Sequence, residues 1–176
     1  MPDPSFEDYF RCPYSNPYYI HEVFDCCNIW FPPGYKGSPD YYNTCSFTER
    51  IINDETNQAM YNYFRQYPRT GNGMIGMFLY DGFDTLDQYC GVEYVEVKLK
   101  RKLEDDKKYW FSTWVSLHDT LSFWGIDKIQ ALFSDTLLYY DQYPVYRCLH
   151  DFNPQVSNPE FRIITDTTNW VKVEGS

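Results

Sequence analysis

Alanine is almost missing from this chain of 176 residues, where it occurs only at Ala59 and Ala131. Helices use alanine heavily, because no other residue is easier to place in a helix. Aromatic residues are abundant instead, with 18 Tyr, 13 Phe and 5 Trp. Their bulky rings favour the pleated, half-buried surface of a strand. The composition therefore predicts an all-β fold, and the length predicts a single domain over residues 1–176.

Long apolar runs are also missing. No stretch of about 18 apolar residues occurs, so no transmembrane segment is expected in this chain. The residues after Met1 are polar and turn-like, and no charged segment leads into an apolar one. If the protein is exported, we expect its signal peptide to have been removed already.

Motifs that mark an enzyme are scarce. His21, His118 and His150 are the only histidines, and the chain has no H-E-x-x-H or G-x-S-x-G motif. His118-Asp119 could supply two members of a triad, but no nucleophile motif completes it. Carboxylate pairs suited to glycoside hydrolysis can always be found among 25 acidic residues, so they carry little weight. We expect no catalytic residues.

Positive charge is in short supply. There are 15 Lys and Arg against 25 Asp and Glu, which gives a formal net charge of -10. Such a surface repels a phosphate backbone, so no nucleic-acid partner is expected. The one basic cluster, at residues 98–102, runs straight into Glu104-Asp105-Asp106, and its field is largely cancelled.

The chain contains six cysteines, at positions 12, 26, 27, 45, 90 and 148. An even number in an acidic, tyrosine-rich chain indicates an oxidising compartment. No C-x-x-C spacing occurs, and the residues by themselves leave the disulfide connectivity open. The adjacent Cys26 and Cys27 could form a redox pair, but we expect structural disulfides to other cysteines.

Short periodic segments predict the strands. The predicted strands cover residues 5–10, 28–31, 74–80, 92–99, 109–117, 128–134, 161–165 and 170–173. The rest of the first 50 residues is predicted as long ordered loops, residues 57–66 as a helical turn or two, and residues 135–160 as a tyrosine-rich loop. Strands at this spacing, joined by loops and not by long helices, predict an antiparallel β-sandwich with at most short helices.

Several motifs follow one another in a fixed order. They are Pro4-Ser5-Phe6-Glu7, Cys12-Pro13, Gly37-Ser38-Pro39-Asp40-Tyr41-Tyr42-Asn43 with Cys45, Glu93-Tyr94-Val95-Glu96-Val97-Lys98-Leu99, and Ile164-Thr165-Asp166-Thr167-Thr168-Asn169-Trp170. With these motifs the chain resembles an N-terminal, galactose-binding-like domain of exported Bacteroidota proteins. Those proteins are chiefly OmpA-family outer-membrane proteins and surface proteins of the gliding and type IX secretion kind. The resemblance covers most of the chain.

The resemblance implies a jelly roll like that of many carbohydrate-binding modules, located at the cell surface, the outer membrane or in the periplasm. It implies a disulfide between Cys12 and Cys45, and a structural calcium ion that Glu7 helps to hold. Family members continue past the position of Gly175 into further strands, whereas this chain stops at Ser176. We therefore expect a fragment of a larger protein, in which the C-terminal strands are either missing or supplied from elsewhere.

Aromatic residues are the candidate ligand-binding residues. Trp110 and Trp114 share one face of the predicted strand at residues 109–117, with Ser112 and Ser116 between and beside them. Sugar rings stack on aromatic planes, and polar neighbours supply hydrogen bonds. The other candidates are Tyr94, Trp124 and the loop residues Tyr139, Tyr140, Tyr143 and Tyr146. The alternative for all of them is packing, in the core of the sandwich or within loops.

These observations predict a non-catalytic binding module, whose ligand is a glycan or another cell-envelope polymer. The alternative is a structural or assembly domain that docks an outer-membrane protein through its aromatic surface and an open sheet edge. A hydrolase is the least favoured function.

Overall fold

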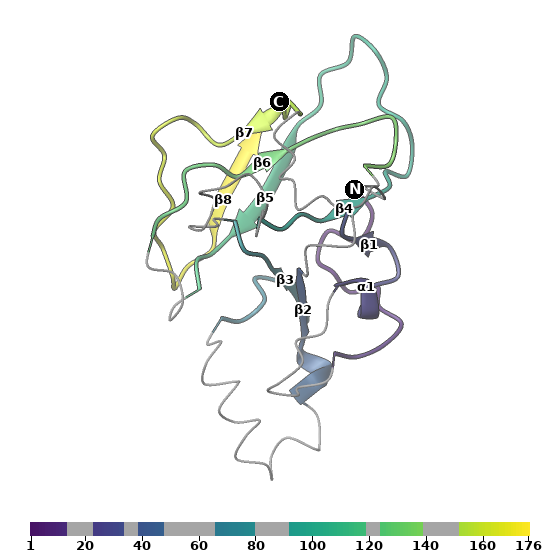
Figure 1. Cartoon of the computed structure of the whole chain (residues 1–176), viewed down its shortest axis with the longest axis vertical. Coiled ribbons are helices and arrows are strands. Elements are labelled where there is room, and N and C mark those ends of the chain that lie inside the picture. The colour runs from purple at the N-terminus through teal and green to yellow at the C-terminus, as the bar shows by residue number, and fades with distance from the viewer. Residues whose placement is uncertain (14–22, 34–38, 48–65, 80–91, 119–123, 139–151) are drawn as a thin grey trace, which may run out of the picture. The chain divides into compact units, whose positions relative to one another are not determined.

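The computed structural model describes residues 1–13, 23–33, 39–47, 66–79, 92–118, 124–138 and 152–176 (Figure 1). The chain divides into two compact units. Unit 1 comprises Met1–Lys100 and Leu137–Cys148, and unit 2 comprises Arg101–Thr136 and Leu149–Ser176. The single domain expected from the length stays a prediction.

Every strand pair in the described residues is antiparallel, and the strands pair two by two. The helices in these ranges are short: α1 is a single turn at Val23–Cys26, and η1 is a 3-10 turn at Thr44–Phe47. The predicted all-β class is therefore confirmed, while the sandwich and jelly-roll arrangement stays a prediction. None of the described helices is long and apolar enough to span a bilayer.

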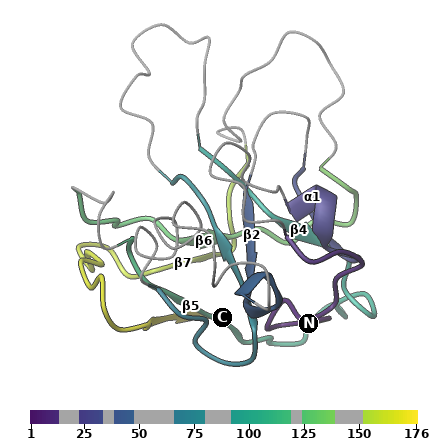
Figure 2. The same ribbon diagram turned by 90° about the horizontal axis from the view of Figure 1, so that it is seen from below.

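Unit 1 contains two of these strand pairs. β1 (Trp30–Phe31) pairs with β4 (Glu96–Val97), and β2 (Asp40–Asn43) pairs with β3 (Gly73–Gly76). The 3-10 turn η1 follows β2 directly, as Figure 2 shows. Adjacent residues of β2 alternate between half-buried and buried, which is the period of a strand with one face in a core.

The core of unit 1 forms around α1, β1 and β2. Cys26, Cys27, Trp30 and Tyr41 are buried together. The partly buried residues packed against them are Phe6, Tyr9, Ile29, Ile75, Val95 and Val97. The ring centroids of Phe6 and Trp30 lie 4.9 Å apart, and the Trp30 indole N–H donates to the carbonyl oxygen of Asp3 at 3.0 Å. The N-terminal segment is thereby tied to the core.

Cysteine pairing agrees with the sequence in one respect and differs in another. Cys12 and Cys45 form a disulfide across 33 residues, which confirms the pairing that the resemblance implied. Cys26 and Cys27 are free thiols, so the structural disulfides expected for them are wrong. α1 places both side chains in the apolar core, where a thiol packs as a small hydrophobic group. Cys90 and Cys148 lie outside the described residues.

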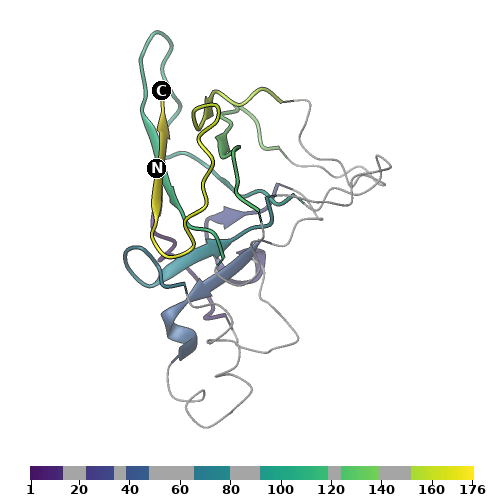
Figure 3. The ribbon, with the colours of Figure 1, turned by 90° about the vertical axis from the view of Figure 1, so that its left-hand side faces the viewer.

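Unit 2 contains the longest strand pair. β5 (Phe111–Val115) pairs with β8 (Val171–Gly175) over five residues, and the two run side by side in Figure 3. A shorter pair joins β6 (Gln130–Ala131) to β7 (Val156–Ser157). Among the described residues of this unit, the buried apolar side chains are Val156, Ile164 and Val173.

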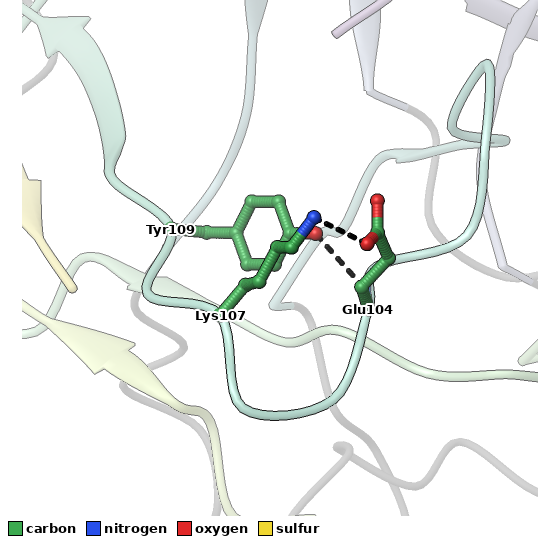
Figure 4. A network of polar contacts seen from close by, with 3 residues as sticks. All are labelled: Glu104, Lys107 and Tyr109. Atoms are coloured by element: carbon green, nitrogen blue, oxygen red, sulfur yellow. Dashed lines mark hydrogen bonds and ion pairs between the residues drawn. The ribbon is translucent and has the colours of Figure 1, made fainter.

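The chain enters β5 through a tight polar loop, shown in Figure 4. The backbone N–H of Glu104 donates to the Tyr109 hydroxyl at 2.9 Å, and the Lys107 ammonium group pairs with the Glu104 carboxylate. Both charged side chains are more than half exposed, so their ion pair adds little stability. The bond to Tyr109 defines the chain path immediately before Trp110.

Several predicted boundaries differ from the observed ones. Residues 5–10 form only an isolated bridge between Tyr9 and Cys27, and residues 161–165 only a bridge between Ile164 and Ile126. Conversely, β2 and β7 occupy segments predicted as loops. Flanking proline, glycine and asparagine residues suggested loops there, whereas the paired strands β3 and β6 supply the backbone partners that hold these segments extended. Residues 57–65 lie outside the described residues.

Candidate functional site

The β5–β8 ribbon presents one exposed face. Along β5, Ser112 and Trp114 are exposed, and the residues between and beside them are half-buried. Ser112 is opposite Glu174, and Trp114 is opposite Lys172. Residues opposite one another in an antiparallel pair project to the same side of the sheet, so these four side chains share a face. The opposite side carries the buried Val173, paired with Thr113.

Trp110 completes this face, although it lies just before β5. It is two residues from Ser112, and its indole N–H donates to Oε2 of Glu174 at 3.3 Å. Despite this hydrogen bond Trp110 is 64% exposed, while Trp114 is 36% exposed. We call the set Trp110, Ser112, Trp114, Lys172 and Glu174 the Trp110–Trp114 face.

The polar centre of the face is the Glu174 carboxylate. Its Oε2 atom accepts from the Lys172 ammonium group at 2.5 Å as well as from Trp110. The hydrogen bond from Lys172 lowers the pKa of Glu174, and the Trp110 N–H and the positive charges of Lys172 and Arg162 act in the same direction. Glu174 is therefore an anion at neutral pH that holds Trp110 by its polar edge and leaves the flat ring available.

This arrangement offers two kinds of contact at once. The tryptophan rings provide apolar planes, and Lys172 and Glu174 provide a donor and an acceptor beside them. A ligand that combines apolar C–H surfaces with hydroxyl groups would satisfy both kinds. Packing in a sheet core, the alternative for Trp110 and Trp114, does not fit the exposure of Trp110. Trp114 is covered over more of its surface.

The other predicted ligand residues are not brought to this face. Trp124 is 74% exposed, but it belongs to the loop in which Ile126 bridges to Ile164, not to the β5–β8 ribbon. Tyr94 is half-buried and belongs to unit 1, two residues before β4. Tyr139, Tyr140, Tyr143 and Tyr146 lie outside the described residues.

Sequence reasoning missed Lys172 and Glu174. Lys172 lies in the predicted strand at residues 170–173 and Glu174 directly follows it, but their place beside the tryptophans follows from the register of β5 with β8. Alternation of side chains along β5 assigns residues to a face, whereas it does not identify the strand that pairs with β5. The signal in the sequence was the alternation of Lys172 and Glu174 with Val171 and Val173.

The residues around Glu7 do not fit the calcium ion that the resemblance implied. Oε1 of Glu7 accepts the backbone N–H groups of Asn72 at 2.6 Å and Gly73 at 3.0 Å, and Oε2 accepts the Asn72 side-chain amide at 3.4 Å. N–H groups repel a cation, whereas calcium requires oxygen ligands. Across the described ranges, no group of three or more His, Cys, Asp or Glu residues could hold a metal ion. Glu7 serves instead as an anchor for the 71–73 turn.

Comparisons of the chain with protein-family models, with curated proteins and with solved structures find no significant match. The geometry of the Trp110–Trp114 face and the motifs of the sequence are therefore the observations that bear on function.

Proposed function

We propose that this chain is a non-catalytic binding module of an exported protein at the cell surface or outer membrane, and that it binds a glycan or another cell-envelope polymer. The observation that carries the proposal is the Trp110–Trp114 face, where two exposed tryptophans lie beside a donor–acceptor pair. The Cys12–Cys45 disulfide favours an oxidising, extracytoplasmic location.

Physical chemistry favours a glycan over the other ligand classes. Leaving an indole ring in water is unfavourable, and exposed apolar groups rimmed by polar ones mark interaction sites. A nucleic acid would also stack on tryptophan, but the net charge of -10 opposes it. A polyhydroxylated ligand has both the C–H faces and the hydroxyl groups that this face can satisfy.

A second function, docking of another envelope protein, has its own observation. Unit 2 exposes further large apolar side chains at Trp124, Phe161 and Ile163, which are 74%, 86% and 60% exposed. Apolar groups displayed in this way are typical of protein contacts. This function predicts that their removal, and not removal of Trp110 or Trp114, abolishes binding.

Affinity electrophoresis in gels that contain soluble cell-envelope and plant polysaccharides tests the proposal. We expect at least one polysaccharide to retard the wild-type protein. Trp110→Ala and Trp114→Ala should each lower the affinity derived from that retardation about tenfold, as removal of a central aromatic contact does. Phe10→Ala is the matched control, because Phe10 is an aromatic residue of unit 1 with 61% exposure. Thermal unfolding checks that each variant is folded.

Two results would count against the proposal. The first is retardation by no polysaccharide. The second is retardation that Phe10→Ala weakens as much as the tryptophan variants do. Capture of a defined outer-membrane protein that is lost in Phe161→Ala, without any glycan retention, would establish the docking function instead.

A further inference from the structure

The Trp110–Trp114 face also restricts the kind of glycan that can occupy it, provided that the proposed function holds. Trp110 and Trp114 are four residues apart on one face, and an extended chain rises by about 3.3 Å per residue, so their Cα atoms are separated by roughly 13 Å. A single sugar ring is shorter than that separation. A ligand that stacks on both tryptophans is therefore a chain of sugars.

Of the donor–acceptor pair, Glu174 lies between the tryptophans along the strand, and the Lys172 ammonium group contacts it from the position beside Trp114. Glu174 is directly opposite Ser112, the residue midway between Trp110 and Trp114, and Lys172 is opposite Trp114. The two charged side chains are 37% and 43% exposed, so both can be reached from solvent. A chain that runs from one tryptophan to the other along β5 must pass over this pair.

Glu174 and Lys172 retain acceptor and donor positions that suit the hydroxyl groups of a sugar. A carboxylate has about four acceptor sites, and Lys172 and Trp110 both use Oε2. An ammonium group has three donors, one of which is directed at Glu174. A hydroxyl group both donates and accepts, so neighbouring hydroxyls of one sugar can bind Glu174 and Lys172 together without breaking their ion pair.

Charge selects among glycans. The Lys172 and Glu174 charges cancel, so the pair offers a carboxylated or sulfated sugar no net electrostatic attraction. Arg162 acts on Glu174 more weakly than Lys172 does. The net charge of the chain is -10, so the protein as a whole repels a polyanion during approach. An uncharged chain of sugars is not repelled during approach and needs no net charge on the face.

From these observations we infer that the face binds a linear, uncharged oligosaccharide laid along β5, with an inner sugar held by Lys172 and Glu174 and sugars on either side stacked on Trp110 and Trp114. The protein sets the orientation of the Trp110 ring, because the indole N–H group of Trp110 is hydrogen-bonded to Glu174.

Isothermal titration with linear gluco-, xylo- and manno-oligosaccharides, from monomer to hexamer, tests this inference, with oligogalacturonides as the acidic counterpart. For one neutral series we expect affinity to rise by about tenfold or more between the dimer and the longest oligomer, because the second tryptophan becomes engaged. Trp110→Ala and Trp114→Ala should each remove that dependence on length. Lys172→Met should weaken binding of the long oligomer, and Phe10→Ala should leave the whole series unchanged.

The possible results separate this inference from the function on which it rests. Binding of monomer and hexamer with equal affinity, or tighter binding of oligogalacturonides than of every neutral series, would overturn the linear, uncharged ligand while glycan binding stands. Binding of no saccharide in any series would overturn both. The wild-type length series alone decides between these results if a tryptophan variant fails to fold.

Discussion

The Glu7 carboxylate oxygen Oε1 lies 2.6 Å from the backbone nitrogen of Asn72, which is 65 residues further along the chain. The same oxygen accepts the Gly73 N–H at 3.0 Å. The contact is close enough that a Cβ atom on Gly73 would collide with the carbonyl oxygen of Phe6. A short motif near the N-terminus and a turn before β3 therefore form one structural unit, although the sequence gives no indication of their proximity.

Removal of the Glu7 carboxylate should destabilise unit 1. We expect Glu7→Ala to lower the free energy of unfolding by about 1–3 kcal/mol, because charged hydrogen bonds to two backbone donors are lost. Urea unfolding monitored by tryptophan fluorescence measures this change. Glu7→Gln retains one acceptor oxygen and should lie between the wild type and Glu7→Ala.

The same variants test the assignment of Glu7 as an anchor and not as a calcium ligand. Calcium or EDTA should shift the melting temperature of the wild type and Glu7→Gln equally. A calcium-dependent stabilisation found in the wild type and lost in Glu7→Gln would show that Glu7 binds the ion.

Cysteine reactivity should divide the described cysteines into two groups. In a non-reducing peptide map, Cys12 and Cys45 should appear in one cross-linked peptide. Cys26 and Cys27 should react with N-ethylmaleimide only after denaturation, because they are buried and burial raises the pKa of both thiols, that of Cys27 to about 12. Rapid alkylation of the native protein at Cys26 or Cys27 would contradict the packing described for α1.

Loss of the disulfide has a predictable cost. We expect Cys12→Ser with Cys45→Ser to reduce the free energy of unfolding by about 2–4 kcal/mol, since the cross-link restricts a long loop in the unfolded chain. Urea unfolding without reductant compares the variant with the wild type. An unchanged midpoint would show that the loop is held by other contacts.

Phe161 occupies a backbone conformation that suits glycine better. Its φ angle is +64°, and it lies in a turn in which the Arg162 N–H donates to the Pro159 carbonyl at 3.0 Å. Such a φ angle costs an L-residue about 1–2 kcal/mol, and the entropy cost of glycine offsets part of the relief. Phe161 is 86% exposed, so little burial is lost.

We therefore expect Phe161→Gly to raise the free energy of unfolding by about 0.5–1 kcal/mol. Phe161→Ala keeps the strained angle and is the matched control, in which no gain is expected. Chemical unfolding measures the stability of both variants. Equal stability of the glycine and alanine variants would mean that the turn carries no strain.

The sequence predicted β5 well because the pattern there is local. Alternation between residues 109 and 117 assigned Trp110, Ser112 and Trp114 to one face, and the structure keeps that assignment. The same kind of reasoning failed for β2, where proline and asparagine beside Tyr41 and Tyr42 suggested a loop. Tyrosine has a high strand preference, and pairing with β3 satisfies the backbone, so tertiary context prevailed over the flanking residues.

The candidate site was predictable only in its aromatic half. A shared face for Trp110 and Trp114 follows from periodicity, whereas its exposure does not. Lys172 and Glu174 join that face through a register between strands about 60 residues apart in the chain. No local pattern encodes that register. The free thiols of Cys26 and Cys27 were missed for a related reason, since the even number of cysteines says nothing about which side chains a core encloses.

Asp166 should give unit 2 a pH dependence in acid. Its Oδ1 atom accepts the backbone N–H groups of Thr168 at 2.8 Å and Asn169 at 2.7 Å, in the turn that leads to β8. The hydrogen bond from the Asn169 N–H, with that from Thr168, lowers the pKa of Asp166 below its ordinary value of 3.8. A carboxylate whose pKa is lower in the folded state contributes stability above the unfolded pKa, and loses it as the pH falls through the folded pKa.

The stability of the wild type should therefore fall more steeply below about pH 4 than that of Asp166→Asn, which cannot lose a negative charge at this position. Urea titrations in steps of pH measure both slopes. Asp127→Asn is the matched control, because Asp127 is an exposed aspartate of the same unit. An identical acid slope in the wild type and Asp166→Asn would show that the charge of Asp166 does not stabilise the turn, and that the N–H groups of Thr168 and Asn169 need only a neutral acceptor.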